Sequence, residues 1–375
     1  MLDLVPFARA GRVMTNGHFK AKVVGRLLQV ILPSPIAEPI APASAQMRNV
    51  HRMRTTLPPT AQDCQGGPGR LLIACALAIV CAWVTAGAQA TLYYCPMHPD
   101  VTAATPDKCV RCGMALVVGD PFDLREYVLD VETTPRAPRA GEPFRLRFTV
   151  RHPSTHAVVD TFALVHDKPY HLFVISQDMT SYDHIHPEQQ PDGAYAIDVT
   201  LPRPGYYRLF SDFLPVGGAP QVIPRVIVTA GFTSDLAASQ AQLAPDTTLR
   251  QTAGDMAVTL ALPSTGLVAG REETLRYRIE DARTGAAVTD VEPYLGAFGH
   301  TLVMSADTLQ YVHAHPVELL PDAAMGPTQP VGGPMLTFKA MLPKPGRYRL
   351  WTQIKRRGVV STAAFTVDVA SPASR

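Results

Sequence analysis

The sequence predicts a mainly β protein, in which a small Cys-rich module precedes two tandem antiparallel immunoglobulin-like β-sandwiches. Three observations predict this fold class: three cysteines lie close together between residues 95 and 112, short runs alternate apolar and polar residues, and one long segment occurs twice. The chain has 375 residues, of which 46% are hydrophobic, so it is long enough for two or three domains.

The first 90 residues are expected to precede the folded chain. Leu71 to Ala88 is an apolar run preceded by Arg70. It leads into Ala88-Gln89-Ala90, whose small residues suit cleavage by signal peptidase. We therefore predict a signal peptide over 53–90 with cleavage after Ala90, and a mature chain that is periplasmic or secreted. An uncleaved leader is the alternative, and it would be the chain's only contact with a membrane.

Residues 1–52 are rich in Pro and Ala and show no clear periodicity. They precede a better-formed export signal, which normally stands at the N-terminus. We interpret them as a non-native or disordered extension, with translation starting at Met47 or Met53.

Beyond the cysteines, Pro and Gly separate short alternating runs such as Phe144 to Val150, and no amphipathic helix stands out. The segment 141–187 aligns without gaps with 270–316 at a constant offset of 129. About 12 extra residues follow in the second copy, and the register then resumes at Leu201 and Leu342 with a Pro-Gly turn and a Tyr that can tie a corner. The predicted units are a module (91–120), sandwich repeat 1 (121–232), a linker (233–249) and sandwich repeat 2 (250–370).

The charge balance excludes a nucleic-acid partner. Lys and Arg number 34 against 32 acidic residues, which leaves no basic field. The sequence also lacks a phosphate-binding loop, a nucleophile elbow and a cofactor fingerprint. Lys355-Arg356-Arg357 is expected to be a solvated turn.

The mature chain would keep only three cysteines, an odd number that suits a ligand set better than a disulfide framework. Cys109 and Cys112 have the two-residue spacing of a metal-binding knuckle, and Gly113 supplies the tight turn. A short hairpin could return Cys95 as the third ligand. The candidates for a fourth are His98, Met97 and Met114.

Spacing alone leaves the metal open. Thiolates with thioethers favour monovalent copper or silver, whereas three Cys with one His suit zinc. A disulfide between Cys109 and Cys112 is the alternative without a metal.

These residues closely resemble the heavy-metal-binding domain found on copper-transporting ATPases and on periplasmic adaptors of copper and silver efflux systems. The resemblance covers about 25 residues, and Val110 stands where the family usually has Pro. It implies metal handling, with copper as the expected metal and an efflux system or copper chaperone as the expected partner. The matching elements are Tyr94-Cys95-Pro96-Met97-His98-Pro99, Pro106, Lys108-Cys109, Cys112-Gly113-Met114 and Leu116.

Each sandwich repeat also carries three histidines at identical spacing: His171, His184 and His186 in the first, and His300, His313 and His315 in the second. If a hairpin turns between Asp178 and Met179, residues whose numbers sum to 357 face each other, and the first three imidazoles share one face. The same construction applies between Asp307 and Thr308. We predict that each triplet binds a metal; a buried polar network is the alternative.

The other histidines of the first repeat, His152, His156 and His166, have no counterpart in the second and are expected to be surface residues. Met179 and Met304 lie near the hairpins, and either could add a soft ligand. Met304 falls on the face of His300, but a core role is favoured for it.

The preferred function is a non-catalytic exported protein that sequesters copper or delivers it to an efflux pump. One alternative is a copper enzyme, because a His-x-His pair with a third His on a β-sandwich resembles the sites of superoxide dismutases and two-domain copper monooxygenases. Another is a structural protein whose sandwiches are spacers and whose only metal site is the Cys module.

Overall fold

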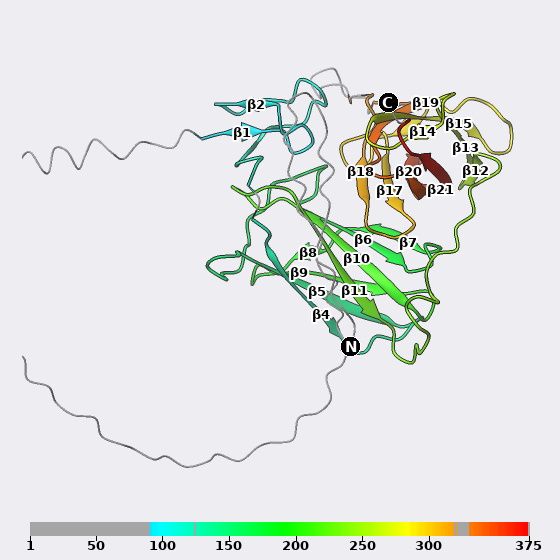
Figure 1. Cartoon of the computed structure of the whole chain (residues 1–375). Coiled ribbons are helices and arrows are strands. Elements are labelled where there is room, and N and C mark those ends of the chain that lie inside the picture. The colour runs from blue at the N-terminus through cyan, green and yellow to red at the C-terminus, as the bar shows by residue number, and fades with distance from the viewer. Residues whose placement is uncertain (1–90, 124, 319, 321–329, 374–375) are drawn as a thin grey trace, which may run out of the picture. The chain divides into compact units, whose positions relative to one another are not determined.

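The computed structural model describes residues 91–123, 125–318, 320 and 330–373 (Figure 1). The predicted extension, signal peptide and cleavage site lie outside these residues. Within them every regular element is a strand, and no helix is long and apolar enough to span a bilayer. The predicted mainly β fold class is confirmed.

The Cys-rich module is a three-stranded sheet in the order β2-β1-β3, made of β1 (Tyr93–Tyr94), β2 (Thr102–Ala103) and β3 (Val117–Val118). Between β2 and β3 the chain forms a knuckle, closed by hydrogen bonds from Cys109 N to Met114 O and from Gly113 N to Cys109 O. Gly113 has a φ of 73°, a conformation that glycine adopts without steric cost.

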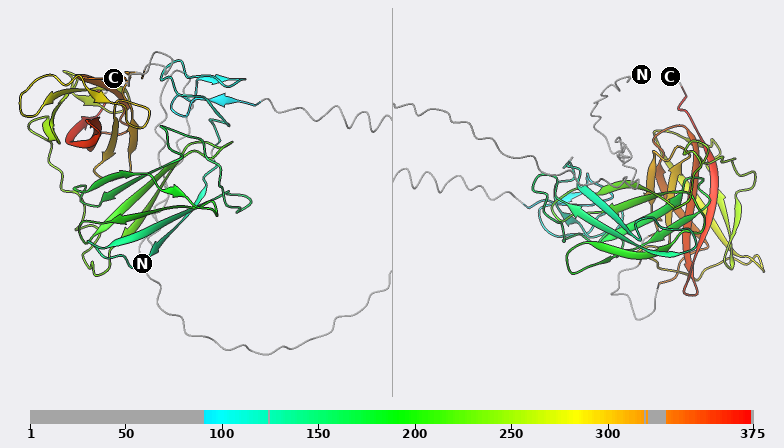
Figure 2. Two further views of the ribbon diagram at one scale, coloured as in Figure 1. Left: turned by 180° about the vertical axis from the view of Figure 1, so that it is seen from behind. Right: turned by 90° about the horizontal axis from the view of Figure 1, so that it is seen from below.

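The first repeat is a sandwich of two antiparallel four-stranded sheets, in the orders β11-β10-β6-β7 and β4-β5-β9-β8 (Figures 1 and 2). Its strands are β4 (Val128–Thr134), β5 (Pro143–Arg151), β6 (Tyr170–Ser176), β7 (Tyr182–Ile185), β8 (Glu188–Gln189), β9 (Tyr195–Thr200), β10 (Tyr206–Phe213) and β11 (Gln221–Val228).

The second repeat pairs a sheet in the order β12-β13-β15-β19 with a six-stranded sheet in the order β14-β21-β20-β17-β18, in which β16 pairs with β20. All its pairs are antiparallel except β14 with β21. Its strands are β12 (Arg250–Ala253), β13 (Met256–Ala261), β14 (Leu267–Val268), β15 (Glu272–Asp281), β16 (Val291–Glu292), β17 (His300–Ser305), β18 (Tyr311–Ala314), β19 (Met335–Met341), β20 (Gly346–Arg356) and β21 (Val359–Ala370).

The alternating patterns predict which side of each strand is buried. Along β5, Phe144, Leu146, Phe148 and Val150 are at most 3% exposed and fill the first core, while the residues between them are exposed or half-buried. All seven residues of β6 are buried instead. A strand buried on both faces must pack against a second layer beyond its own sandwich.

That second layer is the other repeat. One face of β6 contributes Leu172 and Val174 to the first core, and the opposite face places Phe173 and Ile175 in a cluster shared by both repeats. Tyr182 stacks on Trp351 with ring centroids 4.8 Å apart. The buried members of this interface cluster are Phe173, Ile175, Met179, Phe210, Leu302, Met304 and Trp351. Met304 therefore has the core role favoured from the sequence, and Met179 lies in the same cluster.

Each repeat also contains the expected tyrosine corner. The hydroxyl of Tyr207 donates to Arg203 O at 2.8 Å, and that of Tyr348 donates to Lys344 O at 2.8 Å. The equal geometry shows that the duplicated Pro-Gly segments fold alike.

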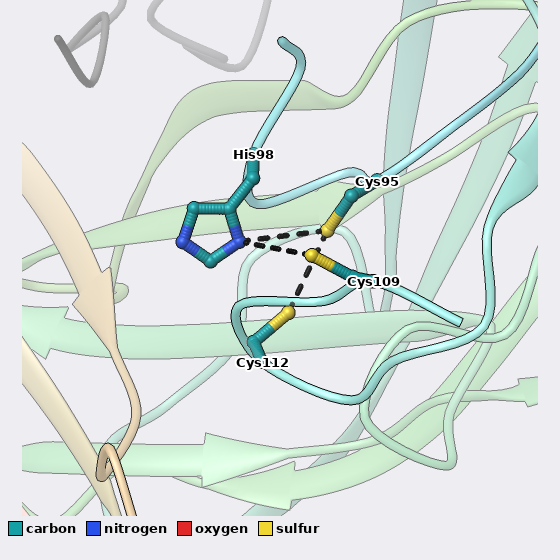
Figure 3. Close-up of side chains that lie close together, drawn as sticks. All are labelled: Cys95, His98, Cys109 and Cys112. Atoms are coloured by element: carbon teal, nitrogen blue, oxygen red, sulfur yellow. Dashed lines mark hydrogen bonds between the residues drawn. The ribbon is translucent and has the colours of Figure 1, made fainter. Parts of the chain in front are cut away.

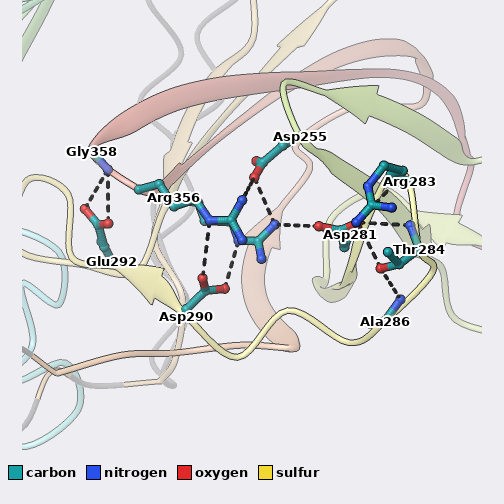
Figure 4. Close-up of polar contacts among 10 residues, drawn as sticks. Asp255, Asp281, Arg283, Thr284, Ala286, Asp290, Glu292, Arg356 and Gly358 are labelled. Atoms are coloured by element: carbon teal, nitrogen blue, oxygen red, sulfur yellow. Dashed lines mark hydrogen bonds and ion pairs between the residues drawn. The ribbon is translucent and has the colours of Figure 1, made fainter.

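The end of β20 differs from the solvated turn expected there. Arg356 has a side chain only 7% exposed, and it forms ion pairs with Asp290, Asp255 and Asp281 (Figure 4). Only Arg357, whose side chain is 64% exposed, fits the expectation. Arg356 thereby ties β20 to the end of β15 and to two neighbouring loops.

Candidate metal centres

The first candidate centre lies at the knuckle of the module. Cys95 directly follows β1, and its Sγ lies 3.6 Å from Cys112 Sγ and 3.7 Å from His98 Nδ1 (Figure 3). His98 Nδ1 is also 3.5 Å from Cys109 Sγ. A tetrahedral ion about 2.3 Å from each sulfur needs ligand atoms about 3.8 Å apart. These three distances are close to those of a tetrahedral site, and all four ligand atoms lie within 4.8 Å of one another.

All three thiols are free, so the alternative disulfide between Cys109 and Cys112 is not formed. The hydrogen bond from Cys95 lowers the pKa of Cys112 to about 4, and the same contact raises the pKa of Cys95. Cys112 therefore loses its proton more readily than Cys95, and an incoming cation would displace the proton of the Cys95 thiol.

The two methionines of the module lie beside this centre. Met97 packs against the buried Cys95 and Cys109. Both Met97 and Met114 line a cavity of about 460 Å³ that also reaches Cys112 and His98. The imidazole of His98 is thus the donor that lies against the sulfurs, and the two methionines line the adjoining cavity.

The second candidate centre is the first histidine triplet, His171, His184 and His186. The hairpin has the predicted register, since Leu172 pairs with Ile185 and Phe173 with His184. His171 Nδ1 lies 3.0 Å from His184 Nε2 and 3.2 Å from His186 Nε2. Three ring nitrogens from two strands therefore converge on one point.

The hydrogen bonds made by the outer ring nitrogens of His171 and His184 determine which nitrogen of each ring carries the proton. His171 Nε2 donates to Val165 O at 2.8 Å, and His184 Nδ1 donates to the Gln353 side-chain oxygen at 2.8 Å. Each ring of this pair therefore has a bare nitrogen on its inner side. Two lone pairs that face each other at 3.0 Å repel, and a cation between them would convert the repulsion into ligation.

The third candidate centre repeats this arrangement in the second sandwich, where Thr301 pairs with Ala314 and Leu302 with His313 as predicted. His300 Nδ1 lies 3.3 Å from His313 Nε2. His300 Nε2 donates to Tyr294 O at 2.8 Å, and His313 Nδ1 lies 3.5 Å from a carboxylate oxygen of Asp212.

The outer partner of His300 is a carbonyl oxygen, which only accepts, so the facing Nδ1 of His300 is again bare. His315 Nε2 is buried and has no hydrogen-bond partner among the described residues. Metal-binding histidines characteristically donate their outer nitrogen to a carbonyl or carboxylate, as here.

Burial disfavours protonation of the imidazoles at these sites. Desolvation, followed by the neighbouring imidazoles, lowers the pKa of His171 to about 4 and that of His186 to about 3. The same causes hold the pKa values of His184, His300 and His315 well below the usual 6.5. These rings are neutral at physiological pH, which is the form that binds metals.

The two triplets adjoin each other across the repeat interface. The ring of His313 lies 5.6 Å from that of His184 and 5.8 Å from that of His171, measured between centroids. Distances within the second triplet are 4.6 to 5.5 Å. The two predicted triplets are thus neighbours. Gln353 and Asp212, which contact the outer nitrogens of His184 and His313, each come from the opposite repeat.

Sequence reasoning missed three residues of these centres: Asp212, Gln353 and His166. Asp212 and Gln353 occupy equivalent places, opposite His171 and His300 on the adjacent strand. Beyond Leu201 and Leu342 the two repeats align at an offset of 141 residues, which makes Asp212 and Gln353 equivalent. A polar residue at this position in both repeats was the signal available in the sequence.

The expectation that His166 is a surface residue is wrong, because its Nε2 is buried and its ring stacks on His315 with centroids 3.5 Å apart. His156 is exposed as expected. His152 is half-buried, and its Nδ1 accepts hydrogen bonds from the backbone of Ser154 and Thr155.

The donor clusters and the duplicated sandwiches together define a metal-binding β protein. The ligand atoms of each cluster lie within 4.8 Å of one another. Residues 92–117 match the heavy metal binding domain, which confirms the resemblance seen in the sequence. Residues 126–231 and 251–371, more than half of the chain, match a family described as domain of unknown function DUF8832, and the chain belongs to that family.

Several solved structures are similar to this chain at low identity. They include the Escherichia coli adhesin FdeC (12% identity, 66% of each chain, TM-score 0.21) and the Yersinia pseudotuberculosis adhesin InvE (14% identity, 64% of this chain and 60% of that one, TM-score 0.20). Fibronectin(III)-like modules of Clostridium thermocellum CbhA match at 12% identity over 65% of this chain and 95% of that one, with a TM-score of 0.18.

The matched region spans less than two thirds of each adhesin's length. The comparison with curated proteins gave no match.

Proposed function

We propose that this protein is a non-catalytic, exported binder of copper or silver, which sequesters the metal or delivers it to an efflux system or copper chaperone. The observation that carries the proposal is the presence of three donor clusters of two chemistries in one chain. One cluster combines three thiols with an imidazole, and two consist of imidazoles only.

The two chemistries suit different forms of the same metal. Thiolates with nearby thioethers favour the soft Cu⁺ and Ag⁺, whereas imidazoles accept Cu²⁺ as readily as Cu⁺. Zinc also fits a Cys₃His tetrahedron and is the competing cation at the knuckle. A chain that can hold both oxidation states is suited to binding excess copper.

Export is supported by the apolar leader Leu71 to Ala88 with its small residues at Ala88 and Ala90. The free thiols of Cys95, Cys109 and Cys112 are close enough to oxidise in a periplasm. A bound metal would protect them, so export and metal occupancy support each other.

Metal analysis of the purified chain tests the proposal. We expect three ions per chain after growth with copper, and two in the variant Cys95→Ser/Cys109→Ser/Cys112→Ser, measured by elemental analysis and native mass spectrometry. His156→Ala, which changes an exposed histidine outside the clusters, is the matched control and should bind three. Preferential retention of zinc from a copper and zinc mixture would contradict the assignment of copper.

Cell fractionation and growth test the remaining parts of the proposal. The mature chain should appear in the periplasmic fraction with its N-terminus at residue 91, and loss of the gene should increase sensitivity to copper or silver. A cytoplasmic chain that begins at Met1 would contradict export, and unchanged metal tolerance would contradict the link to resistance.

A copper redox enzyme is the second candidate, favoured by the proximity of the two triplets and by the Asp212 carboxylate beside His313. Superoxide dismutation and oxygen consumption by the copper-loaded chain distinguish the two functions. Turnover that disappears in His184→Ala would replace the binding role with catalysis.

A further inference from the structure

His166 belongs to the first repeat by sequence but to the second triplet by position. It lies in the loop before β6, and its ring centroid is 3.5 Å from that of His315, 5.6 Å from His300 and 5.9 Å from His313. In the triplet of its own repeat, the ring of His171 lies 6.4 Å away. The distances to His300 and His313 are close to those between members of the second triplet.

The donor atom of His166 is buried without a partner. Its Nε2 makes no hydrogen bond within the described residues, and the same is true of His315 Nε2. An imidazole nitrogen withdrawn from water without a hydrogen bond costs free energy. Both rings, together with His313, line the cavity of about 460 Å³. Two unsatisfied nitrogens on rings that neighbour His300 and His313 indicate a ligand that all four rings would share.

Among the described residues, the first repeat's triplet has no counterpart of His166 from the equivalent loop of the second repeat. At the offset of 129 the residue equivalent to His166 is Leu295, and both have nearly the same backbone conformation, with φ values of 50° and 52°. The side chains at the two positions differ in kind, one an imidazole and the other apolar. The duplicated loops therefore offer a nitrogen donor to the second centre and an apolar group at the matching place of the first.

We infer that His166 is the fourth ligand of the second triplet, which makes that centre a four-imidazole site for Cu²⁺ or Zn²⁺ shared by both repeats. This inference rests on the proposed function, in which the triplets hold metal. The first centre keeps three imidazoles and an open position. Because the stacked rings are only 24° from parallel, their in-plane lone pairs do not converge, and ion binding must turn the His166 ring out of the stack.

The two centres then have different uses. A site closed by four protein ligands retains its ion, whereas a site with three ligands and an open position exchanges it or admits a further molecule. The second centre would link the two repeats through a metal, and the first would be the one that releases its ion.

The test uses the full chain with Cys95→Ser, Cys109→Ser and Cys112→Ser, because thiols would reduce the probe, Cu²⁺. His166→Leu is the informative change, since Leu295 shows that leucine fits this backbone conformation. We expect two Cu²⁺ ions in the parent, and in His166→Leu a loss of affinity at one site only that exceeds the roughly 10- to 100-fold caused by losing an outer partner of a ligand. The nitrogen hyperfine pattern of that ion in electron paramagnetic resonance should also change.

Three further variants make the outcome decisive. His166→Asn keeps a residue that tolerates positive φ but removes the imidazole, and it should behave as His166→Leu does. His186→Ala should abolish the other site, and the exposed His156→Asn should change neither.

Two unchanged sites in both His166 variants would overturn this inference while leaving the proposed function intact. No Cu²⁺ bound by the parent would refute the imidazole sites of the proposed function as well. Weakening of both sites together would show that His166 acts through the interface rather than as a ligand.

Discussion

The two sandwich repeats carry the same histidine donors, but the residues that contact these donors differ. Their hairpins have equivalent registers, and each first histidine donates to a backbone carbonyl six residues earlier. Behind the next histidine the repeats differ: His184 meets the amide of Gln353, while His313 meets the carboxylate of Asp212. The duplicated backbone repeats the positions of the nitrogens, and residues from the opposite repeat make the two centres inequivalent.

This difference has a chemical consequence. A carboxylate that accepts from the outer nitrogen makes an imidazole more basic and a stronger metal ligand than an amide does. With similar donor geometry, the second centre should bind divalent metals more tightly than the first. Each of the following predictions tests whether the repeats are equivalent at one level, beginning with the largest expected effect.

The matched changes His171→Ala and His300→Ala test whether each repeat holds its own ion. Each ring is 2% exposed and contacts the next ring of its triplet, so its removal should eliminate one ion and spare the other. Native mass spectrometry of the metal-loaded chain measures this. Loss of both ions in either variant would mean that the adjoining triplets form a single centre.

The exchange of the outer residues tests the difference itself. Asp212→Asn should weaken the second centre about 10- to 100-fold, and Gln353→Glu should strengthen the first, because each change alters the group behind one imidazole. Competition with a chelator of known affinity gives both constants. Equal affinities in the parent chain would contradict the predicted ranking before any variant is made.

Much of this comparison could be predicted from the sequence, because it depends on local order. The gapless offset of 129 placed equivalent histidines, and turns at Asp178 and Asp307 defined hairpins in which strand periodicity puts the rings on one face. The knuckle follows from the spacing of Cys109 and Cys112 in the same way. In each case neighbouring residues determine the geometry.

The rest depends on contacts between residues far apart in the chain. His184 and Gln353 are 169 positions apart, and local strand periodicity does not pair residues so far apart in the chain. The fully buried pattern of β6 was the available indication, since apolar residues on both faces require two layers to cover them. His166 was misjudged for the same reason: its partner His315 belongs to the other repeat.

The Arg356 network tests whether the repeats are equally dependent on ion pairs. The equivalent position of the first repeat is Pro215, which can form none. Arg356→Met should destabilise the chain by about 1–2 kcal/mol, less than a fully buried pair would lose, because Asp255 and Asp290 are nearly half exposed. Chemical denaturation measures the change. Arg357→Ala is the control, and an equal loss there would show that the burial of Arg356 contributes nothing.

The tyrosine corners should give the smallest effect and the most nearly equal one. Tyr207→Phe and Tyr348→Phe each remove one hydroxyl that donates to a carbonyl four residues earlier at 2.8 Å, and both rings are 1% exposed. A neutral hydrogen bond of this kind contributes about 1 kcal/mol, so each variant should lose about that much in chemical denaturation. The Tyr207 hydroxyl also accepts a hydrogen bond from Arg203 N at 3.3 Å. If the two variants differ, Tyr207→Phe should therefore lose more stability than Tyr348→Phe. A larger loss for Tyr348→Phe would show that the repeats differ in their scaffold as well as in the groups around their metal centres.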